Sequence, residues 1–142
     1  EAELIKVIAM SRLNPVIEKL PKGLNTSVME KGVSLSGGEK QRLALARGLL
    51  AGEKSDIILL DEPTSSVDSL NEMRIHENIF REFKDKTVIS SIHRLHLLDK
   101  FDKIYLFSKG KIIASGKFEE IKRNPVFAEM WRRYSKEKDK EK

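Results

Sequence analysis

The sequence predicts an α/β fold in which a mostly parallel sheet is flanked by helices. Ile57 to Glu62 is an apolar run that ends in two carboxylates, which is typical of a buried strand. Lys86 to Ile92 is rich in β-branched residues and predicts a second strand. Ser69 to Phe83 lies between them with apolar residues at helical spacing. A strand, a helix and a strand in this order favour parallel pairing.

Helices are predicted before the first strand. Apolar residues lie on one face of Glu1 to Leu13, and Asn14-Pro15 separates this helix from a short one at Val16 to Leu20. Leu24 to Ser34 is irregular and polar, which indicates a loop. Gly37 to Ala51 predicts a helix with so many apolar residues that we expect it to be largely packed.

The helix after the first strand is expected to bury one face. That face consists of Leu70, Met73, Ile75, Ile79, Phe80 and Phe83. His76 is expected at the surface or at an edge, because no second metal-binding type of residue lies at helical spacing from it.

The last third of the chain predicts a hairpin and two helices. Asp102 to Phe107 and Lys111 to Ala114 are strand-like, and Ser108-Lys109-Gly110 between them is a hairpin signal. A short helix is expected at Phe118 to Arg123 and a final one at Pro125 to Tyr134. The final helix is expected to bury Phe127, Met130 and Trp131.

Composition limits the class of protein. The chain has 142 residues, which is enough for one domain with a real core, and 35% of them are charged. No apolar run approaches the roughly 20 residues of a membrane helix, and the absence of cysteine excludes disulfides and thiolate metal sites. The net charge of +5 permits weak attraction to nucleic acid or anionic lipid, although a solvated tail is the simpler interpretation. The chain begins at Glu1 within a predicted helix, as a segment of a longer protein would.

Two short motifs carry the candidate chemistry. Ser36-Gly37-Gly38-Glu39 has the spacing of a capping box, and its glycines leave backbone amides uncovered at the positive end of a helix, where a phosphate can bind. Asp61 and Glu62 follow the first strand, where one carboxylate can hold magnesium and the other can take a proton from water. By itself, Gln41 is better explained as a polar group on the helix surface.

These motifs together resemble the ABC ATPase family. Leu35 to Gln41 is similar to the signature motif, Ile57 to Glu62 to the Walker B strand with the glutamate after it, and Ser65 to Asp68 to the D-loop. His93 lies where the family has its switch histidine. The resemblance extends from about Leu20 to Ile121, and the four motifs occur in the family's order.

The resemblance implies a P-loop NTPase-like partial domain that binds ATP and Mg2+. It implies that Asp61 holds the metal through water, that Glu62 is the general base, and that His93 bonds the γ-phosphate. In this family the signature motif of one subunit closes over the ATP of the other, which gives a head-to-tail dimer of nucleotide-binding domains. The implied cofactor-binding residues are Ser36, Gly37, Gly38, Glu39, Gln41 and Asp68.

The chain has no phosphate loop of the form G-x-x-x-x-G-K-[ST]. Gly110 to Lys117 is the nearest match, and it has one residue too many. We therefore expect the 142 residues alone to bind ATP poorly and not to hydrolyse it.

The resemblance implies an organisation and a location. Residues 1–134 correspond to the C-terminal part of the ATPase domain, with 1–52 in the helical subdomain and 53–134 carrying the Walker B, D-loop and switch-histidine portion. Residues 135–142 are a charged tail, expected to be disordered or a frayed helical extension. GVSLSGGEKQR and SSIHRL favour an exporter at the cytoplasmic face of a membrane, in contact with a transmembrane domain and without a nucleic-acid partner. The stretch from Val28 to Val33 is either near the contact with that domain or an ordinary connection.

Two alternatives belong to other classes. The C-terminal lobe of a chromosome-maintenance or repair ATPase, which acts on DNA, also has an LSGG helix and a Walker B strand, but residues 1–20 lack the heptads of its coiled coil. A non-catalytic interaction domain is disfavoured by the intact Glu62 and His93. The transported substrate, and whether the dimer has identical subunits, are left open.

Overall fold

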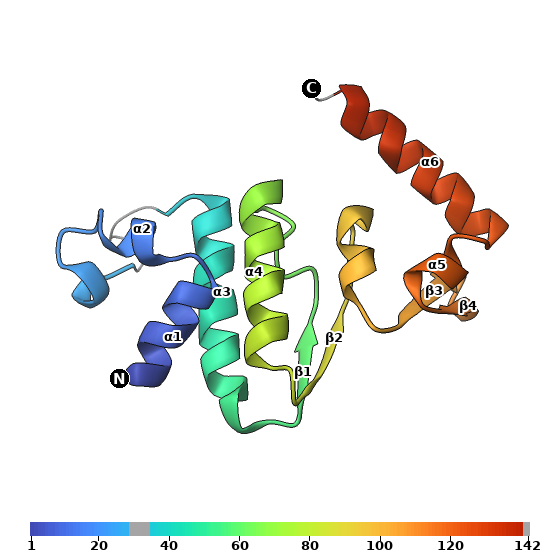
Figure 1. Ribbon diagram of the computed structural model, residues 1–142. Helices are drawn as coiled ribbons and strands as arrows, with labels where there is room; N and C mark the ends of the chain where they lie inside the picture. Colours follow the sequence, from blue (N-terminus) through green and yellow to red (C-terminus); the bar gives the residue numbers. More distant parts are fainter. Residues whose placement is uncertain (29–34, 141–142) are drawn as a thin grey trace. The chain divides into compact units, whose positions relative to one another are not determined.

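A computed structural model describes residues 1–28 and 35–140 of the chain, with the side chains of the last helix described as far as Lys136. The chain divides into two units, Glu1–Ser91 and Ile92–Lys142, which are considered separately below (Figure 1). Most of the predicted 24–34 loop, including residues 29–33 of the possible membrane-domain contact, lies outside the described residues.

The first unit is built from helices and two strands. In chain order they are α1 (Ala2–Met10), α2 (Asn14–Ile17), a single turn at Gly23–Asn25, α3 (Gly37–Ala51), a single turn at Gly52–Lys54, β1 (Ile57–Leu60), α4 (Ser69–Glu82) and β2 (Thr87–Ser90). Helix α1 packs on both α3 and α4.

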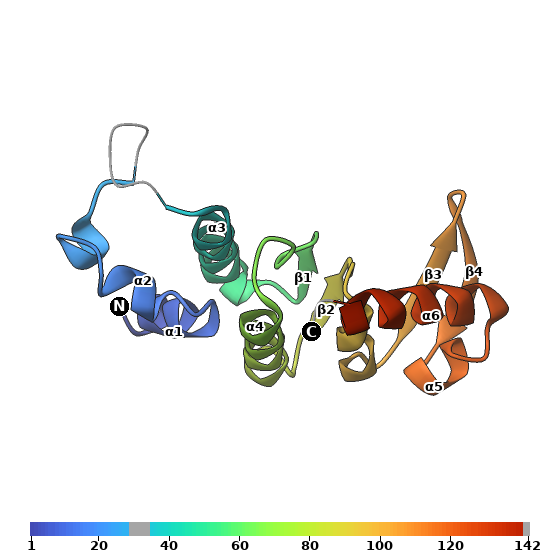
Figure 2. The same ribbon diagram turned by 90° about the horizontal axis from the view of Figure 1, so that it is seen from above.

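The two strands of this unit are parallel, as the sequence predicts. Ile57 lies opposite Thr87 and Leu60 lies opposite Ser90, with α4 as the crossover between β1 and β2. Figure 2 shows α3 and α4 on the same side of the strands. One apolar core joins α3, α4 and β1, and Leu49, Ile75 and Ile79 are completely buried in it. The helices thus hold the C-terminal end of β1 in place.

The other face of this small sheet is uncovered, so the prediction that β1 is buried is wrong. Ile58 faces the core and is 6% exposed, whereas Ile57 and Leu59 are 57% and 73% exposed. Ile89 of β2 lies on the uncovered face as well and is 54% exposed. Successive side chains of a strand point to opposite faces, and the described residues of this unit supply helices to only one.

The buried face of α4 is rotated from the predicted one. Leu70 is 53% exposed, and His76, which we expected at the surface, is 1% exposed. Glu72 is buried too and its carboxylate accepts a hydrogen bond from the Thr64 hydroxyl at 2.8 Å. The turn before α4 supplies this partner, which a helical pattern alone does not reveal.

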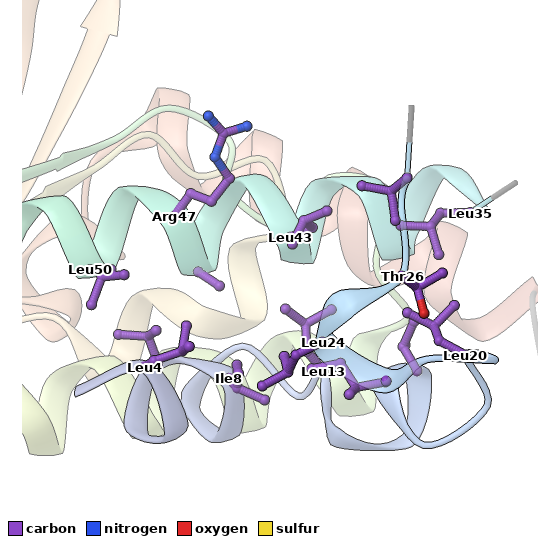
Figure 3. A pocket seen from close by; sticks show the side chains of 16 residues that line it. Leu4, Ile8, Leu13, Leu20, Leu24, Thr26, Leu35, Leu43, Arg47 and Leu50 are labelled. Carbon is purple, nitrogen blue, oxygen red and sulfur yellow. The ribbon is translucent and has the colours of Figure 1, made fainter. Parts of the chain in front are cut away.

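The prediction that α3 is largely packed is only half right. Leu45, Ala46 and Leu49 are buried, while Ala44 and Arg47 are exposed. An apolar cavity of about 160 Å3 is lined by residues of α1, of the segment that follows α1, and of α3 (Figure 3). Thr26 and Arg47 are the polar members of its described lining, and no carboxylate lies there.

The second unit begins with one helical segment at Leu95–Lys100. It continues with β3 (Ile104–Ser108), β4 (Lys111–Gly116), α5 (Phe118–Ile121) and α6 (Pro125–Lys140). β3 and β4 form the predicted antiparallel hairpin. Their apolar face packs on Ile121 and Phe127, which are each 1% exposed.

Helix α6 is longer than the predicted Pro125 to Tyr134 and buries fewer of the expected residues. It continues to Lys140, so residues 135–140 extend the helix, which is one of the two expectations for this segment. Met130, which we expected to be buried, is 41% exposed, while Phe127 is buried and Trp131 packs against the same core. None of the described helices is long and apolar enough to cross a membrane.

Candidate functional site

The start of α3 has the predicted capping box. The Ser36 hydroxyl accepts a hydrogen bond from the Glu39 amide at 3.3 Å, and the Glu39 carboxylate accepts one from the Ser36 amide at 2.8 Å. The bond from the Ser36 backbone lowers the pKa of Glu39. The carboxylate of Glu39 is therefore used in the cap, while the Gly37 and Gly38 amides lie in the first turn, which has no intrahelical acceptor for them.

The two glycines of this turn have different surroundings. A Cβ atom at Gly38 would lie 2.6 Å from the carbonyl oxygen of Ser66, so only glycine allows the helix to approach the D-loop this closely. Among the described residues, none lies within 4 Å of a Cβ atom built at Gly37. Gly38 is thus required by packing inside the chain, whereas the described residues leave space beside Gly37 where an external group can approach.

Gln41 lies one turn further along and bonds to the segment that follows β1. Its amide nitrogen donates to the Glu62 carbonyl at 3.0 Å and to the Ser65 hydroxyl at 2.9 Å. Its amide oxygen accepts from the Ser66 backbone at 2.8 Å. The signature helix and the D-loop are therefore joined within one chain.

The two carboxylates lie at the C-terminal end of β1, and both are exposed. The Ser91 hydroxyl donates to Asp61 at 2.7 Å and accepts from the Glu62 amide at 2.8 Å. Glu62 has a φ of 43°, in the left-handed region that residues other than glycine rarely adopt. An open cavity of about 350 Å3 lies beside them, between α3 and β1, with Asp61 and Gln41 in its lining.

Asp68 begins α4. Its carboxylate accepts from the Asn71 backbone at 3.0 Å and from the Asn71 side chain at 2.7 Å. The backbone bond lowers the pKa of Asp68, so its carboxylate stays charged. This cap accounts for Asp68 structurally, whether or not it also contacts a nucleotide.

The structure brings Gln41 and Gly38 of α3 against the segment after β1, and it joins Asp61 to Glu62 through Ser91. The other predicted site residues of the first unit lie at the starts of α3 and α4: Ser36, Gly37, Glu39 and Asp68. His93 belongs to the second unit and is described apart from the carboxylates, so its contact with the γ-phosphate stays a prediction. Ser91 was missed by the sequence analysis. A hydroxyl at the C-terminal end of the strand parallel to the Walker B strand was the available signal, because such ends meet at one edge of a sheet.

The described residues fit a magnesium ion that is held mainly by a nucleotide. No three carboxylates or histidines among them gather into a metal cluster. Magnesium commonly uses one or two carboxylates together with phosphate oxygens and water. Asp61, exposed at a strand end, can be such a ligand.

Comparisons with known proteins agree with these motifs. Residues 6–65 match the family model described as "ABC transporter". A solved structure described as a bacterial Atm1-family ABC exporter with ATP bound superimposes with a TM-score of 0.81 at 34% identity, over 94% of this chain and 23% of that one. The chain belongs to the ABC transporter family. It comprises part of the nucleotide-binding domain, and the predicted fold class is confirmed.

Two curated relatives support the same family. The heterocyst differentiation ATP-binding protein HepA of Nostoc is 39% identical over 121 residues, which are 85% of this chain and 20% of that protein. A multidrug resistance ABC transporter ATP-binding and permease protein of Lactococcus lactis is 38% identical over 129 residues, 90% of this chain and 22% of that protein. The chain therefore spans about a fifth of the length of these relatives.

Proposed function

We propose that these residues are the part of an ABC exporter that carries the general base for ATP hydrolysis and the signature motif, and that they couple hydrolysis to transport. The observation that carries the proposal is the arrangement of Asp61 and Glu62. Both lie at the end of the Walker B strand, bonded through Ser91 and Gln41 to the neighbouring strand and to the signature helix. The exporter likeness of the relatives supports the direction of transport.

In the proposed mechanism each residue has one task. Asp61 would hold magnesium bound with ATP, and this ion would neutralise charge on the phosphate oxygens. Glu62 takes a proton from the attacking water, and His93 donates to the γ-phosphate. Gly37 and Gly38 present their amides, and Ser36 its hydroxyl, to the nucleotide of a second nucleotide-binding domain.

The proposed partners follow from this division of tasks. Signature motif and general base lie in one chain but serve different nucleotides, so the active form is a head-to-tail dimer of such domains. We propose that a transmembrane domain completes the transporter and places these residues at the cytoplasmic face of the membrane, without a nucleic-acid partner. We propose that another segment supplies the phosphate cradle, because no phosphate loop occurs among the 142 residues.

Glu62→Gln in the full-length protein tests the proposal. The amide keeps the size of the side chain but cannot accept the proton, so we expect ATP binding to persist while turnover falls by at least about 100-fold. Phosphate release and gel filtration with ATP measure the two effects, and an ATP-bound dimer of longer lifetime is expected. Hydrolysis at the wild-type rate would overturn the assignment of Glu62.

A further inference from the structure

Glu62 has an unusual backbone, and the chain holds it from both sides. Its φ of 43° places it in the left-handed region, where an L-residue with a long side chain is disfavoured unless its surroundings impose the conformation. The Glu62 amide donates to Ser91 at 2.8 Å, and the Glu62 carbonyl accepts from Gln41 at 3.0 Å. The two peptide groups that flank the Glu62 side chain are therefore fixed.

Gln41 has no donor hydrogen left for a nucleotide in this arrangement. A side-chain amide carries two N–H hydrogens, and these go to the Glu62 carbonyl and the Ser65 hydroxyl. Its partners also fix which end is which, because the Ser66 amide can only donate and the Glu62 carbonyl can only accept. This use of Gln41 differs from the nucleotide contact that the sequence resemblance implies.

Ser91 joins the two carboxylates of the site. Its hydroxyl accepts from the Glu62 backbone and donates to the Asp61 side chain at 2.7 Å. One hydroxyl can fill both roles because it has a hydrogen and two lone pairs. The candidate metal ligand and the candidate base thus share one support from β2.

We propose that Gln41 and Ser91 are positioning residues that hold Glu62 in its left-handed conformation and aim its carboxylate at the attacking water. The inference rests on the proposed function of Glu62 as general base. Gln41 also links this base to the helix whose first turn faces the nucleotide of the partner domain. Gly38 shows how close the link is, because a Cβ atom there would lie 2.6 Å from the Ser66 carbonyl.

The first test compares kcat with KM in the full-length protein. Gln41→Met fills a similar volume without hydrogen bonds, and Gln41→Glu still accepts from Ser66 but cannot donate to Glu62. For both we expect kcat for ATP to fall about 10- to 100-fold, as displacement of a reacting group does, while KM for ATP changes less than about twofold. Ser91→Ala is expected to act in the same way, and Ser91→Thr, which keeps the hydroxyl, is expected to restore kcat.

A second measurement separates positioning from nucleotide contact. With Glu62→Gln as background, Gln41→Met is expected to keep the ATP-dependent dimer, because the glutamine does not touch the partner's nucleotide. Loss of this dimer, or a raised KM with kcat preserved, would overturn the proposal in favour of direct nucleotide binding. Unchanged kcat in both Gln41→Met and Ser91→Ala would overturn it as well.

The controls keep this result distinct from a failure of the proposed function. Lys54→Met removes an exposed side chain in the turn after α3, outside the motifs, and is expected to leave kcat and KM unchanged. If a Gln41 variant does not fold, the comparison of kcat between Ser91→Ala and Ser91→Thr still tests the proposal, because Ser91 bonds to the amide of Glu62 and not to its carbonyl. If Glu62→Gln hydrolyses ATP normally, the general base itself is wrongly assigned, whatever the Gln41 variants do.

Discussion

His76 is a buried titratable residue that plays no part in the candidate chemistry. It lies on the core face of α4 with 1% exposure, and its Nδ1 atom lies 3.0 Å from the Glu72 carbonyl oxygen. Burial lowers its pKa from the ordinary value, more strongly than the bond and the charge of Glu72 raise it. The folded chain therefore keeps this imidazole neutral at a pH where the unfolded chain protonates it.

This difference predicts a pH dependence of stability. As the pH falls below about 6.5, the unfolded chain binds a proton that the folded chain does not, so the free energy of unfolding decreases. His76→Gln removes this titration. Between pH 7 and pH 5.5 we therefore expect the free energy of unfolding to fall less steeply with pH than in the wild type, by at most about 1.4 kcal/mol per pH unit. Urea unfolding of the 142-residue chain at several pH values measures it. Equal slopes in the two proteins would contradict the prediction.

Local rules predicted some residues well and missed others. Ser36 and Glu39 form a capping box because that motif depends on a spacing of three residues and needs nothing else. Ser91 and Gln41 bond to residues 29 and 21 positions away, respectively, and only the folded chain brings such partners together. The position of Asp61 and Glu62 at the end of a strand could therefore be predicted from the sequence, and the residues that bond to them could not.

At the scale of elements, the type of each α-helix and strand followed from its pattern, while burial and the helical segment at Leu95–Lys100 did not. β1 was expected to be covered on both faces because its four residues are all apolar. In the described chain its core face meets α3 and α4, and its other face is exposed. A continuous apolar run indicates that both faces of a strand are covered in the complete domain. Which face stays covered in a partial domain cannot be predicted from this pattern.

The uncovered face predicts self-association of the 142-residue chain. Ile57, Leu59 and Ile89 form an exposed apolar surface on a sheet of two strands, and such surfaces promote association between copies. Leu59→Lys is expected to shift the chain toward the monomer and to change the free energy of unfolding by less than about 0.5 kcal/mol. Sedimentation velocity over a concentration series measures this effect.

Ile58→Lys is the matched control for Leu59→Lys. Ile58 is the adjacent residue and faces the core with 6% exposure, so a lysine there would bury a charge and is expected to unfold the first unit. A Leu59→Lys chain that unfolds in the same way, or associates as strongly as the wild type, would contradict the exposure of this face.

At the scale of the whole molecule, the proposed function assigns the motifs of this chain to two different nucleotide sites, and neither site is complete. In this proposal Asp61 and Glu62 act on a nucleotide that a phosphate loop holds beside them. The signature helix presents amides, but the lysine and the amide cradle of a phosphate loop occur nowhere in the sequence. Order and spacing of motifs were enough to predict both the family and this incompleteness.

The 142-residue chain is therefore expected to bind ATP more weakly than about 1 mM and to release no phosphate above the rate of a Mg2+-ATP blank. Phosphoryl transfer depends almost entirely on positioning and charge stabilisation around the γ-phosphate, and one carboxylate pair without the cradle supplies neither. Calorimetric titration with ATP and a phosphate-release assay measure the two quantities. The same chain with Glu62→Gln is the control, because a trace of contaminating ATPase would persist in it. Hydrolysis that the wild-type chain shows and Glu62→Gln abolishes would mean that these residues complete a nucleotide site among themselves, and the division of tasks between two domains would have to be abandoned.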